Sequence, residues 1–226
     1  LRLDNLTTFV LDEADRMLEM GFLPDLDYIM AEMPRERQTL LFSATFPKQI
    51  QKIAEEIMFE PVIVKVASTH DDNTIDQHFY QLESNKDRQK ALRLLLLQHR
   101  PESAVVFCNT KRETKEVAAT LANDGFSVVA LHGDLEQRDR DITLMQFANK
   151  SASVMVATDV AARGLDIEAL DMVVNYEFAY DTEVHIHRIG RTGRAGSLGT
   201  AYTFFNSEDD YKVKLLEEYL DREITS

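Results

Sequence analysis

Residues 153–166 read Ser-Val-Met-Val-Ala-Thr-Asp-Val-Ala-Ala-Arg-Gly-Leu-Asp, and this stretch decides the fold class. It contains a continuous apolar run at 154–157, which is typical of a parallel strand that is buried on both faces. Segments in which apolar residues recur at helical spacing separate this run from others like it. The comparable runs occupy 104–107, 127–131, 172–175 and 200–205. The alternation predicts an α/β fold in which helices cover both faces of a parallel sheet.

The same alternation occurs on both sides of a polar gap. Residues 68–74 contain no apolar side chain, so we predict a linker at 67–75. Before it we expect strands at 7–11, 38–42 and 61–66 and a helix at 47–58. Between the first two of these strands, apolar residues recur at roughly helical spacing from Met17 to Met30. After the linker we expect strands at 78–82 and 153–157 besides the runs above, and helices at 86–98, 111–123, 137–148, 184–190 and 208–220. We therefore interpret residues 1–66 as the C-terminal part of one α/β domain and residues 76–226 as a complete second domain.

Composition limits the class of protein further. The chain has 226 residues, of which 44% are hydrophobic, enough to bury a core. Its longest aliphatic run, Leu94–Leu97, is far shorter than the ~20 residues of a membrane-spanning helix. The single cysteine, Cys108, excludes an internal disulfide and suits a reducing compartment. We expect a cytoplasmic monomer that does not associate with membranes.

The formal net charge of −14 argues against a nucleic-acid-binding protein, because such proteins usually carry a basic surface. The motifs that follow the predicted strands point the other way, and we give them the greater weight.

Two polar clusters follow strands of the first domain. Asp12-Glu13-Ala14-Asp15 comes after the strand at 7–11, where one carboxylate could hold Mg²⁺ through water and another could orient an attacking water. The alternative is an ordinary helix N-terminus, which also favours acidic residues. Ser43-Ala44-Thr45 follows the next strand. Its hydroxyls could bridge to the acidic loop, or they could simply cap the helix that Pro47 opens.

Two clusters in the second domain carry arginine. The segment from Thr158 to Asp166 combines threonine, arginine and two aspartates in one loop, although a solvated turn remains an alternative. In His187–Arg194, arginines recur at spacing three, which suggests a phosphate-bearing partner. A solvated basic face and internal salt bridges are the alternatives. Weaker candidates for phosphate contacts are Asn109-Thr110 with Arg112, and His132-Gly133-Asp134 with Gln137–Arg140.

Taken in order, these elements resemble the motifs of one family, the DEAD-box ATP-dependent RNA helicases. Asp12–Asp15 is similar to motif II, and Ser43–Thr45 to motif III. Val106-Phe107 with Asn109-Thr110 resembles motif IV, and Gln137-x-x-Arg140 resembles the family's QxxR element. Thr158–Asp166 is similar to motif V and His187–Arg194 to motif VI. The resemblance covers nearly the whole chain and implies RecA-like parallel sheets, one partial domain and one complete domain.

The resemblance also implies a role for individual residues. Asp12 would hold the Mg²⁺ of bound ATP through water, and Glu13 would orient and deprotonate the attacking water. Asp15 would couple the domains through Ser43, Thr45 and His187. Asp166 would bind the ATP ribose, and Arg191 and Arg194 would act as arginine fingers. The residues that would hold the RNA backbone are Thr110, Gly133, Arg140, Thr158 and Arg163, and such contacts read phosphates and 2′-hydroxyls rather than bases.

The resemblance also implies a binding partner, and it leaves other functions open as alternatives. Segments 107–111 and 131–141 are similar to a bacterial branch of the family that acts on 23S ribosomal RNA in large-subunit assembly, so RNA, and 23S rRNA in particular, is the expected partner. The family's phosphate loop, G-x-x-x-x-G-K-[ST], does not occur in these 226 residues. We therefore expect a fragment with little ATPase activity of its own. The alternatives are a non-enzymatic RNA-binding or partner-docking module and a DNA-directed ATPase of the same superfamily.

Overall fold

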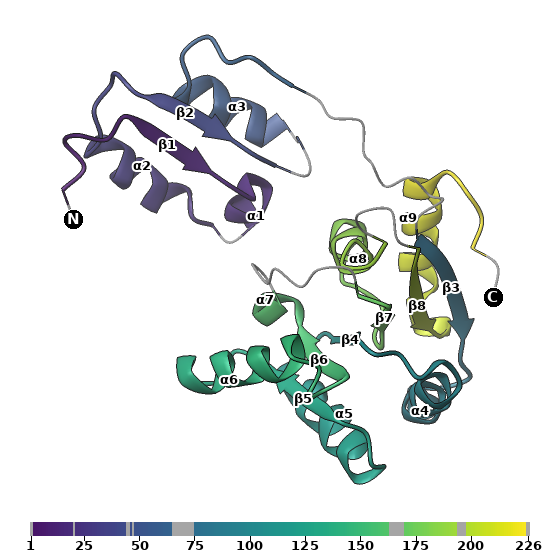
Figure 1. Ribbon diagram of the computed structural model, residues 1–226. Helices are drawn as coiled ribbons and strands as arrows, with labels where there is room; N and C mark the ends of the chain where they lie inside the picture. The colour runs from purple at the N-terminus through teal and green to yellow at the C-terminus, as the bar shows by residue number, and fades with distance from the viewer. Residues whose placement is uncertain are drawn as a thin grey trace. The chain divides into compact units, whose positions relative to one another are not determined.

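The computed structural model describes residues 2–19, 21–43, 46, 48–64, 75–162, 170–193 and 198–224, apart from the side chains of Arg16 and Glu19. The chain divides into two compact units, Leu1–Ala67 and Ser68–Ser226 (Figure 1). The linker predicted at 67–75 lies outside the described residues, except for Ile75, which begins a strand.

The first unit contains a parallel pair of strands with helices. The strands are β1 (Thr8–Leu11) and β2 (Gln38–Leu41), and the helices are α1 (Ala14–Glu19), α2 (Leu23–Ala31) and α3 (Lys48–Ile57). Leu11 of β1 packs against Leu26 of α2 and against Ile50 and Ile53 of α3 in one small core. Gly21, with a φ of 71°, lies in the turn between α1 and α2. The strands predicted at 7–11 and 38–42 and the helix at 47–58 are therefore confirmed to within a residue or so.

The strand predicted at 61–66 is wrong for residues 61–64, which are not in a strand; residues 65 and 66 are outside the described part of the chain. The side chains of Val62 and Val64 are 85% and 80% exposed. The apolar composition suggested a buried strand, but a strand also needs a neighbour whose backbone groups it can pair with. The described strands of this unit, β1 and β2, pair with each other and not with this segment.

The second unit is built on a six-stranded parallel sheet in the order β3-β8-β7-β4-β6-β5. Its strands are β3 (Ile75–Gln81), β4 (Ala104–Cys108), β5 (Val128–Leu131), β6 (Val154–Thr158), β7 (Met172–Asn175) and β8 (Gly199–Phe205). Its α-helices are α4 (Arg88–His99), α5 (Lys111–Asn123), α6 (Gln137–Ala148), α7 (Asp159–Ala162), α8 (Thr182–Ile189) and α9 (Asp210–Leu220). The predicted α/β class with parallel sheets is confirmed; the short helix α7 is additional to the prediction.

Helices cover both faces of this sheet. On one face α4 and α5 contribute residues such as Leu96 and Leu121 to the larger core, and on the other α6, α7 and α8 contribute residues such as Phe147 and Ile189. Leu216 of α9 packs against Phe79 of β3. None of the helices in the described part of the chain is both long and apolar enough to span a membrane.

The chain order of the strands places a topological switch point beside β4. From β4 the chain proceeds to β5 and β6 on one side, and then returns to β7 and β8 on the other side (Figure 1). In open parallel sheets the loops at the carboxyl ends of the strands diverge at such a point and leave room for a ligand. The loops that follow β4, β6 and β7 are therefore where a binding site is expected in this unit.

Candidate functional site

In the first unit, the acidic residues Asp12 and Glu13 are exposed at the carboxyl end of β1. The Asp12 carboxylate accepts a hydrogen bond of 2.9 Å from the backbone N–H of Glu13. Glu13 has a φ of 51°, a left-handed conformation that is uncommon for residues other than glycine. Backbone strain of this kind concentrates at functional sites, where the surrounding structure holds it in place.

The acidic loop is joined to the segment that follows β2. The backbone N–H of Asp15, which is buried, donates to Oγ of Ser43 over 3.1 Å, and the N–H of Ala14 donates to the carbonyl of Phe42 over 3.1 Å. The structure thus brings together Asp15 and Ser43, two of the residues that the sequence suggested for coupling. Thr45, a third, lies outside the described residues.

The chemistry at Asp12 fits a magnesium ion. Proteins usually hold Mg²⁺ through one or two carboxylates, with water and phosphate oxygens completing the coordination. Asp12 offers an exposed carboxylate at the end of a parallel strand, and Glu13 beside it offers a second acid. Asp12 would hold such an ion, and the ion when bound would neutralise charge on phosphate oxygens.

In the second unit, the switch point is filled by the side chain of Arg188, which is only 2% exposed. Its guanidinium binds Asp159, which follows β6, through two nitrogens at 2.6 and 2.8 Å. It also donates to Oδ1 of Asn109 over 2.7 Å and to the carbonyl of Glu177 over 2.9 Å. Its carbon Cζ lies 5.3 Å from the centre of the Phe107 ring. One side chain from α8 therefore ties together the ends of β4, β6 and β7.

This arrangement corrects the expectation that Arg188, Arg191 and Arg194 face a common external anion. The anion bound by Arg188 is Asp159 of the same chain, which was the internal salt bridge left open as an alternative. Arg191 is half-buried, and its carbonyl accepts a hydrogen bond of 3.3 Å from the N–H of Leu170. Arg194 lies outside the described residues.

The proposed RNA contacts differ in how far they are exposed. Thr110 and Gly133 are exposed at the carboxyl edge of the sheet, and Thr110 caps α5 by accepting from the N–H of Glu113 over 3.1 Å. Thr158 is 6% exposed. Its hydroxyl accepts from the N–H of Ala161 over 3.4 Å, and a guanidinium nitrogen of Arg140 donates to the carbonyl of Ala161 over 2.7 Å. Thr158 and Arg140 thus stabilise the short helix α7 through hydrogen bonds to the backbone of Ala161. Arg163 and Asp166 lie outside the described residues.

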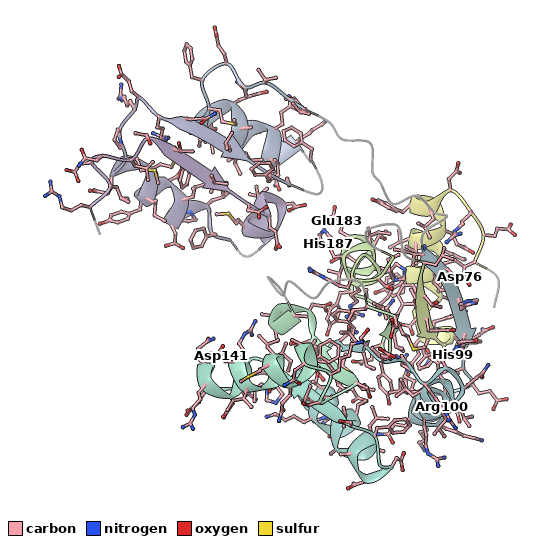
Figure 2. The ribbon with its side chains drawn as sticks, in the orientation of Figure 1. Asp76, His99, Arg100, Asp141, Glu183 and His187 are labelled. Atoms are coloured by element: carbon pink, nitrogen blue, oxygen red, sulfur yellow. The ribbon has the colours of Figure 1, made fainter. Side chains whose placement is uncertain are left out.

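Helix α8 is anchored also by the buried ring of His185, which sequence reasoning did not single out. Its ring stacks between Phe79 and Phe178, with centroids at 6.0 and 5.9 Å. Its Nε2 has no hydrogen-bond partner among the described residues. His187, by contrast, is exposed on α8 one helical turn after Glu183 (Figure 2). The helix that carries Arg188 is therefore fixed by a buried ring and a buried guanidinium.

Burial, and then the positive charge of Arg188, lower the pKa of His185 from its ordinary 6.5 to about 3. Between these values the unfolded chain binds a proton that the folded chain does not, so the free energy of unfolding should decrease as the pH falls. The expected slope is about 1.4 kcal/mol per pH unit for this group. Urea unfolding at several pH values would measure it.

The control for this prediction is a second histidine on the same helix. Replacing His185 by phenylalanine should keep the ring stack and remove the pH-dependent loss, whereas the same replacement at exposed His187 should leave the loss in place. An equal pH dependence in the wild type and in His185→Phe would show that His185 is not its source.

Comparisons with known proteins show the family of the chain. The model of the DEAD/DEAH box helicase family matches residues 1–53, and that of the helicase conserved C-terminal domain matches residues 86–196. The ATP-dependent RNA helicase DbpA of Escherichia coli is 50% identical over 218 residues, which are 96% of this chain and 48% of that protein. This chain spans about half the length of the curated relatives that it matches.

The chain is also similar to solved structures of DEAD-box proteins. The structure titled Saccharomyces cerevisiae Dbp5 bound to RNA and ADP BeF3 has a TM-score of 0.89 and 31% identity, covering all of this chain and 60% of that one. The E. coli DEAD-box protein SrmB, bound to regulator of ribonuclease activity A, has a TM-score of 0.63 and 31% identity, covering 66% of this chain and 88% of that one. The RecA-like fold expected from the motifs is therefore confirmed.

Proposed function

The chain belongs to the DEAD-box family of RNA helicases, and from that premise we propose that the protein containing it couples ATP hydrolysis to local separation of RNA duplexes. The observation that supports this most directly is the acidic loop of the first unit. Asp12 and Glu13 are exposed at the end of a parallel strand, and Ser43 holds the loop in place through Asp15. Acidic residues at that position suit the hydrolysis of a nucleotide phosphate.

The division of labour that we propose follows the two units. Asp12 holds Mg²⁺ through water, while Glu13 orients the attacking water and accepts its proton. The oxygen of that water bonds to the γ-phosphorus as the bond to the bridging oxygen of ADP breaks. Arg191 and Arg194 stabilise the charge that develops on the γ-phosphate, and Asp166 binds the ribose. Asp15, Ser43, Thr45 and His187 couple the two units when they close on ATP and RNA.

The second unit supplies the RNA surface in this proposal. Thr110, Gly133 and Arg163 contact the backbone of one strand, and Arg140 and Thr158, which bind the backbone of Ala161, hold the loop after β6 beside it, so binding is tolerant of sequence. A few arginines and backbone amides at the carboxyl edge of the sheet are enough for RNA binding, even though the net charge of the chain is negative. The similarity to DbpA leads us to propose 23S ribosomal RNA and assembly of the large ribosomal subunit as the biological target.

The test is RNA-stimulated ATP hydrolysis by the full-length gene product. We expect RNA to stimulate turnover, 23S rRNA to do so more than unrelated RNA, and Glu13→Gln to abolish it. The 226-residue chain alone should hydrolyse little ATP, because no phosphate loop occurs in it.

Other results of this experiment would favour the alternatives. Equal stimulation by DNA would support a DNA-directed ATPase. RNA binding by the full-length product without any turnover would support a binding module and contradict the proposed enzyme.

A further inference from the structure

A carboxylate bridges two lysines beside the proposed RNA contacts. Asp134, just after β5, binds Nζ of Lys111 at 2.5 Å and Nζ of Lys115 at 2.9 Å. The two lysines lie on successive turns of α5, which begins directly after β4. All three side chains are substantially exposed: 44% for Asp134, 57% for Lys111 and 51% for Lys115. The cluster therefore faces solvent at the carboxyl edge of the sheet.

The position of Asp134 is fixed by its neighbours. The backbone N–H of Asp134 donates to Nδ1 of His132 over 3.3 Å, and His132 is 7% exposed. Burial, and then the charge of Lys115, lower the pKa of that imidazole, so it remains a neutral acceptor near pH 7. Gly133 next to it is open: a Cβ there would meet nothing nearer than the Lys111 side chain, at 4.0 Å. A ligand can thus approach the backbone of Gly133 while contacting the lysines.

The charges in the cluster favour an anion. Hydrogen bonds from Lys111 and Lys115 lower the pKa of Asp134 to about 2, so the carboxylate is ionised throughout the physiological range. Two ammonium groups share this single negative charge, which leaves one net positive charge in a chain whose formal charge is −14. Exposed ion pairs contribute little stability and are exchanged readily. An RNA phosphate can therefore replace Asp134 as the partner of the two lysines with little loss of free energy.

We propose that Asp134 holds the place of an RNA phosphate between Lys111 and Lys115 until RNA arrives, and thereby weakens RNA binding. Without RNA, the carboxylate keeps the two ammonium groups together next to Thr110 and Gly133. With RNA, the lysines bind a backbone phosphate, and the carboxylate that remains nearby repels it. The residue thus makes the second unit release its strand more easily. This inference rests on the proposed RNA-binding function of that unit.

The variant that tests it is Asp134→Asn in the 226-residue chain, with a fluorescent oligouridine as the probe. Binding should become roughly fivefold tighter at low salt, because a negative charge next to the phosphate is removed. The slope of log affinity against log salt should become steeper by about 0.7, because the Asp134 carboxylate that RNA frees in the wild type takes up a cation and so offsets about one of the counterions released from a single strand. Fluorescence anisotropy at several KCl concentrations gives both quantities.

Glu102→Gln is the matched control. Glu102 also binds a lysine, Lys150, at 2.5 Å on the surface, but it precedes β4 and so lies at the opposite edge of the sheet. The affinity and the salt slope of this variant should equal those of the wild type. An equal gain in Glu102→Gln would mean that net charge alone matters, and would overturn the proposal.

A double-mutant cycle distinguishes two effects of Asp134: occupying Lys111 and Lys115 in the absence of RNA, and repelling an RNA phosphate directly. In the Lys111→Met/Lys115→Met background, Asp134→Asn should give a much smaller gain, because no lysine is left to be released. An undiminished gain in that background, or unchanged or weaker binding by Asp134→Asn itself, would overturn the inference while leaving RNA binding established. Failure of the wild type and every variant to bind oligouridine would overturn the proposed RNA-binding role together with this inference.

Discussion

Alanine at Arg191 is expected to lower kcat for ATP in the full-length protein by roughly 10³–10⁵-fold while changing RNA affinity only slightly. Arginine fingers contribute about this much in related phosphoryl transfers, because they stabilise charge that exists only in the transition state. The backbone of Arg191 is held by two hydrogen bonds at the end of α8, one from the N–H of Leu170 to its carbonyl and one from its own N–H to the carbonyl of Arg188. Arg194→Ala is expected to behave in the same way.

Single-turnover ATP hydrolysis, measured with RNA at saturation, tests the first prediction. Arg93→Ala is the control, because Arg93 is an exposed arginine on α4 and lies outside the proposed catalytic and RNA-binding residues. Turnover close to that of the wild type would remove Arg191 from the catalytic residues. A parallel loss of RNA affinity would instead indicate that Arg191 serves the RNA.

Replacing Arg188 by methionine should destabilise the second unit by about 3–5 kcal/mol, the usual cost of removing one partner from a buried ion pair. The substitution leaves the Asp159 carboxylate, which is 16% exposed, without its guanidinium, and it leaves the oxygens of Asn109 and Glu177 without a donor. For a unit of about this size, the melting temperature should fall by roughly 10 °C. Hydrogen exchange of the β4, β6 and β7 amides in the whole chain would report the loss directly.

Two further variants make this prediction specific. Arg188→Lys should recover only a small part of the stability, because one ammonium group cannot replace the fork that reaches Asp159, Asn109 and Glu177 together. Arg188→Met/Asp159→Ala should be less destabilised than the sum of the single variants, because the buried charge is then removed as well. A melting temperature of Arg188→Met equal to that of the wild type would show that the hydrogen bonds of Arg188 to Asp159, Asn109 and Glu177 do not stabilise the unit.

The fold could be predicted because its signals are local. The helix predicted at 111–123 matches α5, since Thr110 is a side-chain cap directly after an apolar strand. The strand predicted at 61–66 was wrong over 61–64, because the pairing that makes a strand depends on a neighbour that a sequence run does not reveal. The break between α1 and α2 at Gly21 was also not predicted, since apolar residues continue at helical spacing across it.

The site was predictable in part. Asp15 and Ser43 were paired through the resemblance of their motifs, and the structure brings them into contact. Arg188 was grouped with its neighbouring arginines because spacing within α8 is visible in the sequence. Its actual partner, Asp159, is 29 residues away along the chain, and only the order of β4, β6 and β7 brings the two together. His185 carried no signal at all, because its surroundings come from β3 and from the loop after β7.

The network around Arg188 also bears on how this protein can vary during evolution. One guanidinium satisfies oxygens from three separate strand ends, so a change at Asn109, at Asp159 or at Arg188 leaves at least one buried group unsatisfied. Single substitutions in this set are therefore expected to be destabilising, and natural variants should keep or replace its members together. The exposed loops on either side are not held by these hydrogen bonds, so their sequences can vary while this connection between strands stays fixed.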